Sequence, residues 1–457
     1  MNNAVDVGKL IDDGPFTTLQ KIAVFLAALS IVLDGFDGQL IGYAIPGILK
    51  EWGITRGAFA PAVAAGLIGM GIGSACAGLL ADRFGRRWAT IVSVLVFGAA
   101  TSCVGFAPDV TTIALLRLVA GFGIGGVLPS STTMTAEFTP AKWRTFAVTA
   151  TIVLYPLGGM LAGLYAQQIL STYSWHSLFF IGGLLPLAYG IVLIFTLPES
   201  PRFLVRRSAR WQELRALLVR MGRTVAADAT YVDALEARQE QRVSFASIFK
   251  AGMARDTLAI WCAFFMCLIA SYSAFSWLPA MLASAGLPAS LAGSGLTAYN
   301  LGGVFGALGC AFAIARFGSR GPLLVCCAGA ALSAFAMLGV DATKAPALLV
   351  LGFGVHGLFV NAVQSTMYAL CAYVYPTGVR GTGTASALAF GRLGAVLSAF
   401  VGAAVISAGG PKAYLGMLAI AMLFVLVALA VVRNHIARKG RLQMTDLIDR
   451  TVRANAE

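Results

Sequence analysis

Two aspartates, Asp34 and Asp37, interrupt the first long apolar stretch of the sequence. They are three residues apart, so on a helix both carboxylates lie on one face. Two nearby carboxylates in an apolar medium resist ionising together, and one of them can therefore hold a proton near neutral pH. The spacing indicates a proton-binding pair. The plainer alternative is a kinked, water-lined helix turn assisted by Gly35 and Gly38, and which aspartate titrates stays open because a close pair titrates as one system.

Few other charged residues lie deep in apolar stretches. Among the basic residues only Arg117 and Arg392 do so, and His356 is the one deep histidine. Arg117 is suited to exchange partners with an acid of the first stretch as a proton moves, and Arg392 is a bidentate donor for a carboxylate. The plainer interpretations are a fixed ion pair for Arg117, a side chain that reaches toward the polar boundary for Arg392, and packing for His356.

Amides, phenols and an indole in the second half of the chain are further candidates for binding a small molecule. They are Gln364, Tyr368, Asn300, Asn361, Trp277 and Tyr272. Gln364 and Tyr368 are four residues apart and share a helix face. The aromatic members are suited to stack on an aromatic ring, although aromatic residues in apolar stretches more often pack or anchor at interfaces.

The chain that positions these residues is too apolar for a water-soluble protein. Of its 457 residues, 58% are apolar and 12% are charged, against roughly 45–50% and 25% in soluble domains. A membrane-spanning helix needs about 20 mostly apolar residues. Twelve stretches meet this condition, at 21–46, 58–81, 89–108, 110–136, 145–169, 176–197, 257–284, 291–315, 321–340, 346–374, 382–407 and 413–432. The sequence therefore predicts an all-α membrane protein with twelve transmembrane helices.

The polar segments divide the chain into five parts. We predict a cytoplasmic N-terminal tail at 1–20, a six-helix bundle at 21–197, a cytoplasmic linker at 198–256, a second six-helix bundle at 257–432 and a cytoplasmic C-terminal tail at 433–457. This topology puts 27 of the 33 Lys and Arg residues on the cytoplasmic side and four on the other, as the positive-inside rule requires. Topology thus explains the net charge of +13, and no basic patch interleaved with aromatic residues indicates nucleic-acid binding.

The two predicted bundles are related by an internal repeat. Similar residues recur at Asp82–Arg87 and Ala315–Arg320, an offset of 233, and at Gly121–Gly126 and Gly352–Gly357, an offset of 231. Two parallel six-helix repeats favour a binding site between the halves and transport by rocking, alternating access.

These motifs resemble the major facilitator superfamily over nearly the whole chain. Gly78–Arg87 matches the superfamily's loop motif after the second span, Arg117–Gly125 resembles its second motif, and Pro198–Arg202 resembles a motif of sugar and organic-ion porters. Asp34–Asp37 resembles the acidic signature of the aromatic acid:proton symporters. The resemblance implies proton-driven import of benzoate-, hydroxybenzoate- or phenylpropanoid-type acids, with the proton as coupling ion and no cofactor.

The resemblance also implies a cytoplasmic gate made of inter-domain salt bridges. Its residues are Asp82, Arg83, Arg86, Arg87, Glu137, Arg144, Glu199, Arg202 and Arg380. The plainer interpretation is ordinary positive-inside anchoring. The second copy of the loop motif has Ala315 and Ser319 where an acid and a base are usual, which weakens the expected gate in the second half.

Other functions stay open at this point. A porter for a sugar or another organic acid would carry the same fold, and so would a membrane sensor that binds aromatic acids without transporting them. No nucleophile–base set, metal-ligand cluster or cofactor motif in the sequence indicates an enzyme. We expect a monomer in the bacterial inner membrane, with lipid, a proton and a small aromatic acid as its partners.

Overall fold

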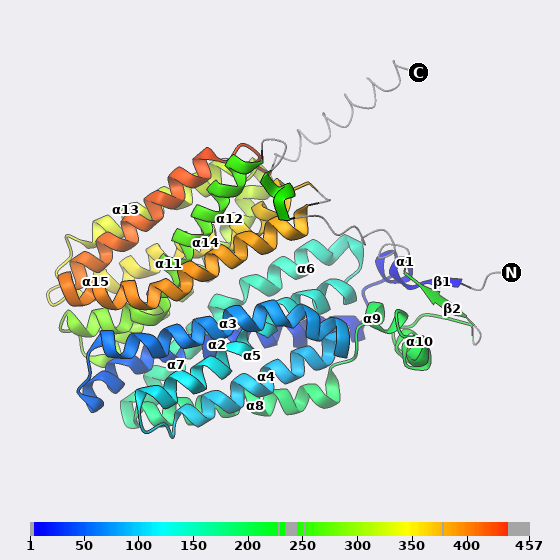
Figure 1. The fold of residues 1–457 in the computed structure, drawn as a ribbon, viewed down its shortest axis with the longest axis horizontal. Helices are drawn as coiled ribbons and strands as arrows, with labels where there is room; N and C mark the ends of the chain where they lie inside the picture. The colour runs from blue at the N-terminus through cyan, green and yellow to red at the C-terminus, as the bar shows by residue number, and fades with distance from the viewer. Residues whose placement is uncertain (1–3, 227–228, 234–244, 250–252, 377–378, 437–457) are drawn as a thin grey trace, which may run out of the picture. The chain divides into compact units, whose positions relative to one another are not determined.

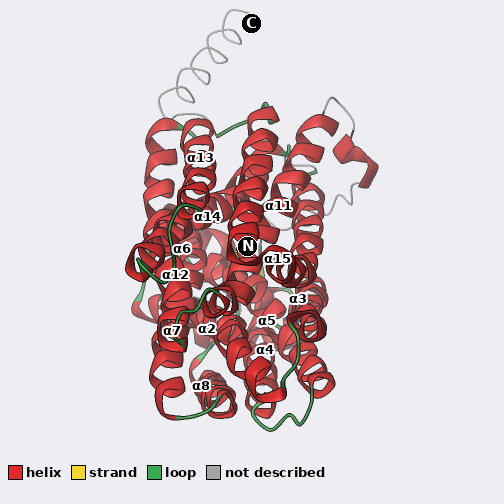
Figure 2. Cartoon of the chain, turned by 90° about the vertical axis from the view of Figure 1, so that its left-hand side faces the viewer, coloured by secondary structure: helices red, strands yellow, loops and turns green. Residues whose placement is uncertain are grey.

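The computed structural model describes residues 4–226, 229–233, 245–249, 253–376 and 379–436, and helices dominate these ranges (Figures 1 and 2). Eleven helices among the described residues are long and apolar enough to cross a membrane. Residues 234–244 of the predicted linker and 437–457 of the predicted C-terminal tail lie outside the described residues.

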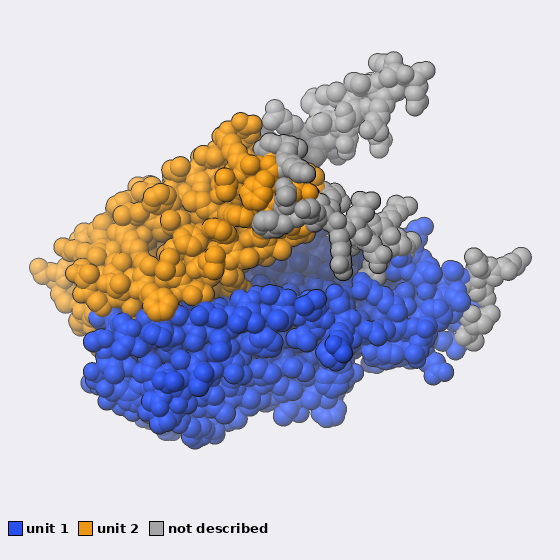
Figure 3. All heavy atoms as spheres, viewed as in Figure 1, with its two compact units in different colours: residues 1–242 blue, residues 243–457 orange. Residues whose placement is uncertain are grey.

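The chain divides into two compact units, residues 1–242 and 243–457 (Figure 3). The long helices of the first unit are α2 (Thr18–Trp52), α3 (Arg56–Phe84), α4 (Arg86–Val104), α5 (Val110–Phe138), α6 (Ala141–Val153), α7 (Tyr155–Thr172) and α8 (Trp175–Thr196). Those of the second unit are α11 (Ala254–Ser284), α12 (Ala289–Phe317), α13 (Arg320–Met337), α14 (Pro346–Val374) and α15 (Arg380–Val431).

Polar caps mark where several of these helices begin. The Thr55 hydroxyl accepts a hydrogen bond from the Ala58 amide at 3.3 Å before α3, and the Asp109 carboxylate accepts one from the Thr112 amide at 2.7 Å before α5. Such caps satisfy backbone N–H groups that have no partner within the helix. Between the caps each helix bonds its own backbone, which an apolar medium requires.

The fifth predicted span is interrupted. The sequence predicted one helix over 145–169, but α6 ends at Val153 and α7 begins at Tyr155. Pro156 lies in the first turn of α7. A proline there needs no N–H partner, whereas inside a continuous helix it would remove one hydrogen bond and clash with the carbonyl four residues earlier.

The helix α15 contains two membrane spans. It is 52 residues long, and Gly410 within it has φ 64° and ψ −157°, a conformation outside the helical region that favours glycine. A straight helix of this length would measure roughly 78 Å, more than twice the thickness of a bilayer core. The break separates the predicted spans 382–407 and 413–432. When α6 and α7 are counted together as one span and α15 as two, the eleven long apolar helices among the described residues confirm the twelve predicted spans.

The two units repeat one packing pattern. In the first unit α3 packs against α5, and α4 packs against α5 and α8. In the second unit α12 packs against α14, and α13 packs against α14 and α15. The shared pattern is what the repeated sequence motifs predict.

A small extramembrane layer joins the first unit's N-terminal segment to the segment that follows α8. It contains β1 (Ala4–Asp6), α1 (Val7–Asp12), α9 (Pro201–Val205), η1 (Ser208–Arg210), α10 (Trp211–Arg220) and β2 (Thr230–Val232), which gather at one end of the unit (Figure 1). β1 and β2 pair in parallel, with Ala4 opposite Thr230. Val7 and Ile11 are fully buried there. In the second unit η3 (Phe245–Phe249) precedes α11.

Candidate functional site

A buried acid–base pair lies inside the first unit. The Arg117 Nη1 atom of α5 is 3.9 Å from the Asp37 Oδ2 atom of α2. Asp37 is fully buried and Arg117 is 4% exposed. The separation is that of an ion pair without a direct hydrogen bond. A small movement of either helix can therefore separate the two groups, and protonation of the carboxylate would remove one of the two charges.

The neighbours of this pair come from two further helices, α4 and α7. Thr101 of α4 lies beside the Asp37 carboxylate, and Tyr155 at the start of α7 lies beside Arg117. A side chain on Gly35 would collide with the Tyr155 carbonyl, so the glycine lets α7 approach α2 closely. The helix stays continuous through Gly35, which differs from the kink that the sequence left open. Asp34, one turn before Asp37, is also buried.

A second polar cluster lies inside the second unit. The Arg392 Nη1 group of α15 donates to the Tyr272 hydroxyl of α11 at 2.8 Å, and the guanidinium lies 5.8 Å from the centre of the Tyr272 ring. Tyr368 of α14 lies beside Arg392, Tyr272 and Gln364. Four of the residues predicted to bind substrate are thus brought together from three helices. We call these four residues, Arg392, Tyr272, Tyr368 and Gln364, the arginine–tyrosine cluster.

The other predicted binding residues have different surroundings. The His356 Nδ1 atom lies 3.0 Å from both the Ala330 carbonyl and the Ser333 hydroxyl of α13. This ring nitrogen therefore already has hydrogen-bond partners within the protein. Asn300 and Asn361 each donate to the carbonyl four residues earlier in their own helix, at 2.9 and 3.0 Å. Trp277 is fully buried, with its ring close to Gly402 of α15.

A charge cluster connects the helix ends at the extramembrane layer of the first unit. The Arg86 guanidinium lies 3.0 Å from Asp82 and 3.4 Å from Glu137. Glu137 also accepts a short hydrogen bond from the Ser200 hydroxyl. Glu199 accepts hydrogen bonds from the Arg87 amide at 3.1 Å and the Ser200 amide at 2.9 Å. The predicted gate residues of α3, α4 and α5 are thereby tied to the segment after α8.

Gly85 and Glu199 fit each other within this cluster. Gly85 has φ 101°, which favours glycine, and a side chain there would run into the Glu199 carboxylate. Burial raises the pKa of Glu199 above its ordinary value, although the amide donors of Arg87 and Ser200 favour its charged form. The loop after α3 can therefore close over the carboxylate only because its turn residue has no side chain.

Two acids that the sequence did not single out complete this cluster. Asp12 of α1 accepts hydrogen bonds from Arg144 and Arg202, the latter at 3.2 Å. Arg202 also lies 3.5 Å from Asp233, which follows β2. Both acids lie in polar segments, where a charge costs nothing and so gives no signal. One feature of the sequence hinted at Asp12: it lies in the predicted cytoplasmic tail, on the side of the membrane where most of the basic residues are expected.

Two of the predicted gate residues, Arg83 and Arg380, lie outside this charge cluster. Arg83 is exposed, and its guanidinium lies 5.4 Å from the centre of the Phe84 ring. Within the described residues Arg83 has no acidic partner. Arg380 belongs to the second unit and donates to the Tyr375 carbonyl at 3.4 Å, beside the end of α14.

Sequence comparison finds similar proteins over most of the chain. The family model described as Major Facilitator Superfamily matches residues 27–387 and 260–450. The 4-hydroxybenzoate transporter PcaK of Pseudomonas putida is 34% identical over 413 residues, which cover 90% of this chain and 91% of that protein. The gallate transporter of Pseudomonas putida is 31% identical over 442 residues, which cover 95% and 96%.

Structure comparison finds the same fold in solved proteins. The partially occluded, inward-open xylose transporter XylE from E. coli has a TM-score of 0.73 at 18% identity, covering 92% of this chain and 99% of that one. A D-xylose–proton symporter has a TM-score of 0.72 at 18% identity, with the same coverage. At this identity the likeness concerns the fold.

Proposed function

We propose that this chain, which belongs to the Major Facilitator Superfamily, is a proton-coupled symporter that imports an aromatic carboxylate by alternating access. The family prediction made from the sequence motifs is confirmed, and the chain is a transporter rather than an enzyme. The cargo, the coupling ion and the direction of transport are the parts that we propose. We further propose that it acts in the bacterial inner membrane with both termini in the cytoplasm.

The observation that carries proton coupling is the buried pair of Asp37 and Arg117. An uncompensated charge inside a membrane costs roughly 2.5–3.5 kcal/mol on insertion scales. Asp37 and Arg117 compensate each other at 3.9 Å. A proton on Asp37 would remove one charge and release Arg117 for another partner. Proton binding would thus change the interactions that hold α2 to α5.

The arginine–tyrosine cluster supports an aromatic carboxylate as the cargo. Arg392 gives one N–H to the neutral hydroxyl of Tyr272, and a guanidinium has five N–H donors in a fork that matches a carboxylate. Tyr272 and Tyr368 add aromatic surface beside this cation. A cation next to aromatic rings suits a ligand with a negative group on a ring. The similar transporters of 4-hydroxybenzoate and gallate support the same cargo.

The charge cluster supports a gate at the predicted cytoplasmic end. Arg86, Asp82 and Glu137 link the ends of α3, α4 and α5, so a movement of these helix ends is transmitted to all of them. We propose that breaking and remaking of such ion pairs accompanies the change of access. Glu199 and Asp12 extend the same network to the extramembrane layer.

Uptake into proteoliposomes tests the proposal. Radiolabelled 4-hydroxybenzoate should accumulate above its external concentration when an inward proton gradient is imposed, and a protonophore should abolish the accumulation. Excess unlabelled benzoate, gallate and xylose are added separately as competitors. Competition by the aromatic acids and none by xylose supports the cargo. An uptake rate that does not change with the proton gradient would refute proton coupling. Failure of every aromatic acid to compete would refute the proposal that the cargo is an aromatic carboxylate.

A further inference from the structure

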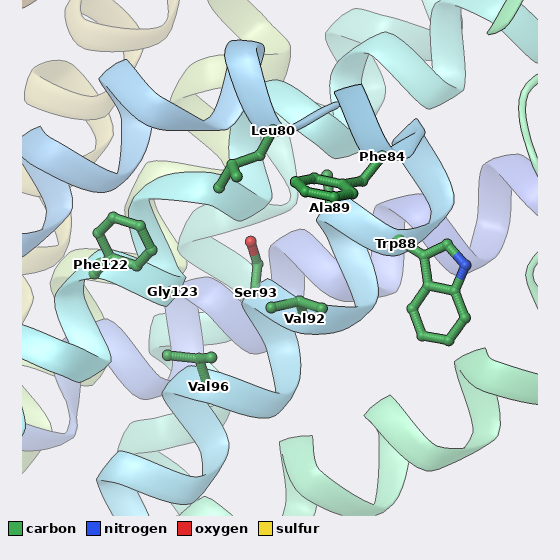
Figure 4. A pocket seen from close by; sticks show the side chains of 9 residues that line it. All are labelled: Leu80, Phe84, Trp88, Ala89, Val92, Ser93, Val96, Phe122 and Gly123. Carbon is green, nitrogen blue, oxygen red and sulfur yellow. The ribbon is translucent and has the colours of Figure 1, made fainter. Parts of the chain in front are cut away.

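Each unit has an apolar groove among its long helices. Groove 1 lies among α3, α4 and α5 of the first unit, has a volume of about 480 Å³, and is lined by the side chains in Figure 4. Groove 2 lies among α12, α13 and α14 of the second unit and has a volume of about 510 Å³. Both volumes fall in the range of roughly 300–1,000 Å³ that is typical of small-molecule sites.

The two grooves are built from equivalent positions of the internal repeat. Six lining residues of groove 1 have a counterpart in groove 2 exactly one repeat offset, 233 residues, later in the chain. The pairs are Leu80 and Ala313, Phe84 and Phe317, Trp88 and Gly321, Ala89 and Pro322, Val92 and Val325, and Ser93 and Cys326. Two separately formed grooves at equivalent positions indicate a feature of the repeat itself.

The grooves offer apolar surface to their surroundings. Phe84 is 54% exposed and its counterpart Phe317 is 62% exposed. Val92 on α4 and its counterpart Val325 on α13 are also exposed, at 49% and 65%. In a chain with twelve membrane spans, large apolar side chains of this kind contact hydrocarbon. The groove chemistry therefore fits an acyl chain.

Exposed arginines lie at one end of each groove. The Arg83 guanidinium lies 5.4 Å from the centre of the Phe84 ring, and the Arg316 guanidinium lies 5.8 Å from the centre of the Phe317 ring. Arg320 begins α13 beside groove 2 and is exposed. None of these three arginines pairs with an acid in the part of the chain that the structure describes. They lie at the predicted cytoplasmic ends of their helices, where anionic lipid headgroups are found.

We propose that each groove binds an anionic phospholipid of the cytoplasmic leaflet. One acyl chain fills the groove, and the phosphate is held by Arg83 at groove 1 and by Arg316 and Arg320 at groove 2. These exposed cations select an anionic headgroup, because one basic residue near a membrane surface contributes about 1 kcal/mol of attraction to anionic lipid. The proposal does not depend on the identity of the transported cargo.

Trp88 is a natural reporter at the mouth of groove 1. We would reconstitute the full chain in vesicles that carry brominated acyl chains on either phosphatidylglycerol or phosphatidylcholine, at equal total bromine. The difference between wild type and Trp88→Phe isolates the Trp88 signal from that of the other six tryptophans. We expect stronger quenching when the bromine is on the anionic lipid, with a preference of roughly fivefold, the effect of one basic residue.

Matched variants assign the preference to the arginine and to the groove. Arg83→Gln should bring the ratio at Trp88 close to one, and Arg83→Lys should restore it. Gly321→Trp in the Trp88→Phe background puts the reporter at the equivalent position of groove 2, where an added Cβ atom meets no other atom within 4 Å. Its preference should depend on Arg316 and Arg320. Phe195→Trp, on α8 outside both grooves and 83% exposed as Phe195, should show no headgroup preference.

Two results would overturn the proposal. Equal quenching of Trp88 by both lipids, unchanged in Arg83→Gln, would show that the arginine selects no headgroup. Absence of quenching at Trp88, with full quenching at position 195, would show that protein covers the groove, for example a second copy of the chain. The groove 1 measurement uses the native tryptophan, so it needs no introduced reporter, and the only variant it needs is the conservative Trp88→Phe.

Discussion

Arg392 combines a permanent charge with a fixed direction. Its Nη1 group donates to the Tyr272 hydroxyl at 2.8 Å, and the guanidinium lies near that tyrosine's ring. Tyr272 is buried, so the hydrogen bond orients a cation that would otherwise sample many rotamers.

Arg392→Gln should raise the KM for 4-hydroxybenzoate by about ten- to a hundredfold, since a hydrogen bond to a charged group contributes roughly 1.5–3 kcal/mol. Tyr272→Phe leaves the guanidinium in place and removes only the hydrogen bond that orients it, so it should raise KM less, by about two- to tenfold. Initial rates of uptake into proteoliposomes measure both. An equal effect of the two substitutions would contradict direct binding of the carboxylate by Arg392.

Glu199 gives a prediction for pH. Burial raises its pKa in the folded chain, so the folded state binds this proton more tightly than the unfolded state does. Its contribution to the unfolding free energy therefore increases as the pH falls through the raised pKa, and levels off below the ordinary glutamate value. The apparent Tm of wild type relative to that of Glu199→Gln should therefore rise as the pH is lowered from neutral toward the ordinary glutamate pKa. A relative Tm that falls with acidification would contradict the burial of this carboxyl.

The sequence predicted some of these residues and missed others for a physical reason. Asp37 and Arg117 were detectable because a charge inside an apolar stretch needs a partner, and the structure provides one at 3.9 Å. The role of Asp12 was not detectable, because an acid in a polar tail is ordinary and its two arginines are far away in the chain. The surroundings of His356 depend on α13, which no spacing within α14 reveals.

At the scale of elements, α1 connects α6 to α9 in the first unit. Its last residue, Asp12, receives hydrogen bonds from the start of α6 and from α9. Asp12→Asn should lower the apparent Tm by an amount that corresponds to about 1–3 kcal/mol, because it leaves two partly buried arginines without this charge. Asp13→Asn is the matched control, since its exposed side chain has no partner in the described part of the chain. Equal effects of both substitutions would contradict a stabilising connection of α6 and α9 through Asp12.

The turn between α3 and α4 offers a sharper test. Gly85→Ala should destabilise the protein by about 1–3 kcal/mol or more, because φ 101° is strained for alanine and the added carbon meets Glu199. Gly71→Ala, in the interior of α3, meets no atom within 4 Å. It should be neutral or slightly stabilising, because alanine favours helix by roughly 0.5–1 kcal/mol. Thermal unfolding of the detergent-solubilised variants measures both, and a stable Gly85→Ala variant would contradict the fit.

Element ends were less predictable than element existence. All twelve spans follow from apolar length alone, because the bilayer requires it. The interruption at Leu154 depends on Pro156, and the break in α15 depends on Gly410 and the adjacent Pro411. Both signals are present in the sequence, but whether a proline or glycine bends a helix, breaks it or leaves it straight depends on its neighbours in space.

At the scale of the whole molecule, the two repeats share one architecture but contain different polar clusters. Both units share one packing pattern and one type of apolar groove. The buried acid–base pair belongs to the first unit, whereas the arginine–tyrosine cluster belongs to the second. We infer a division of labour in which one repeat carries the proton and the other holds the carboxylate.

The most direct test of that account separates exchange from accumulation in Asp37→Asn, which keeps the size of the side chain but cannot release a proton. Wild type should accumulate labelled 4-hydroxybenzoate under an inward proton gradient and should also exchange it for unlabelled substrate without a gradient. We predict that Asp37→Asn retains exchange and loses accumulation. Gradient-driven accumulation by Asp37→Asn at the wild-type level would contradict the central claim that this buried aspartate couples the proton to transport.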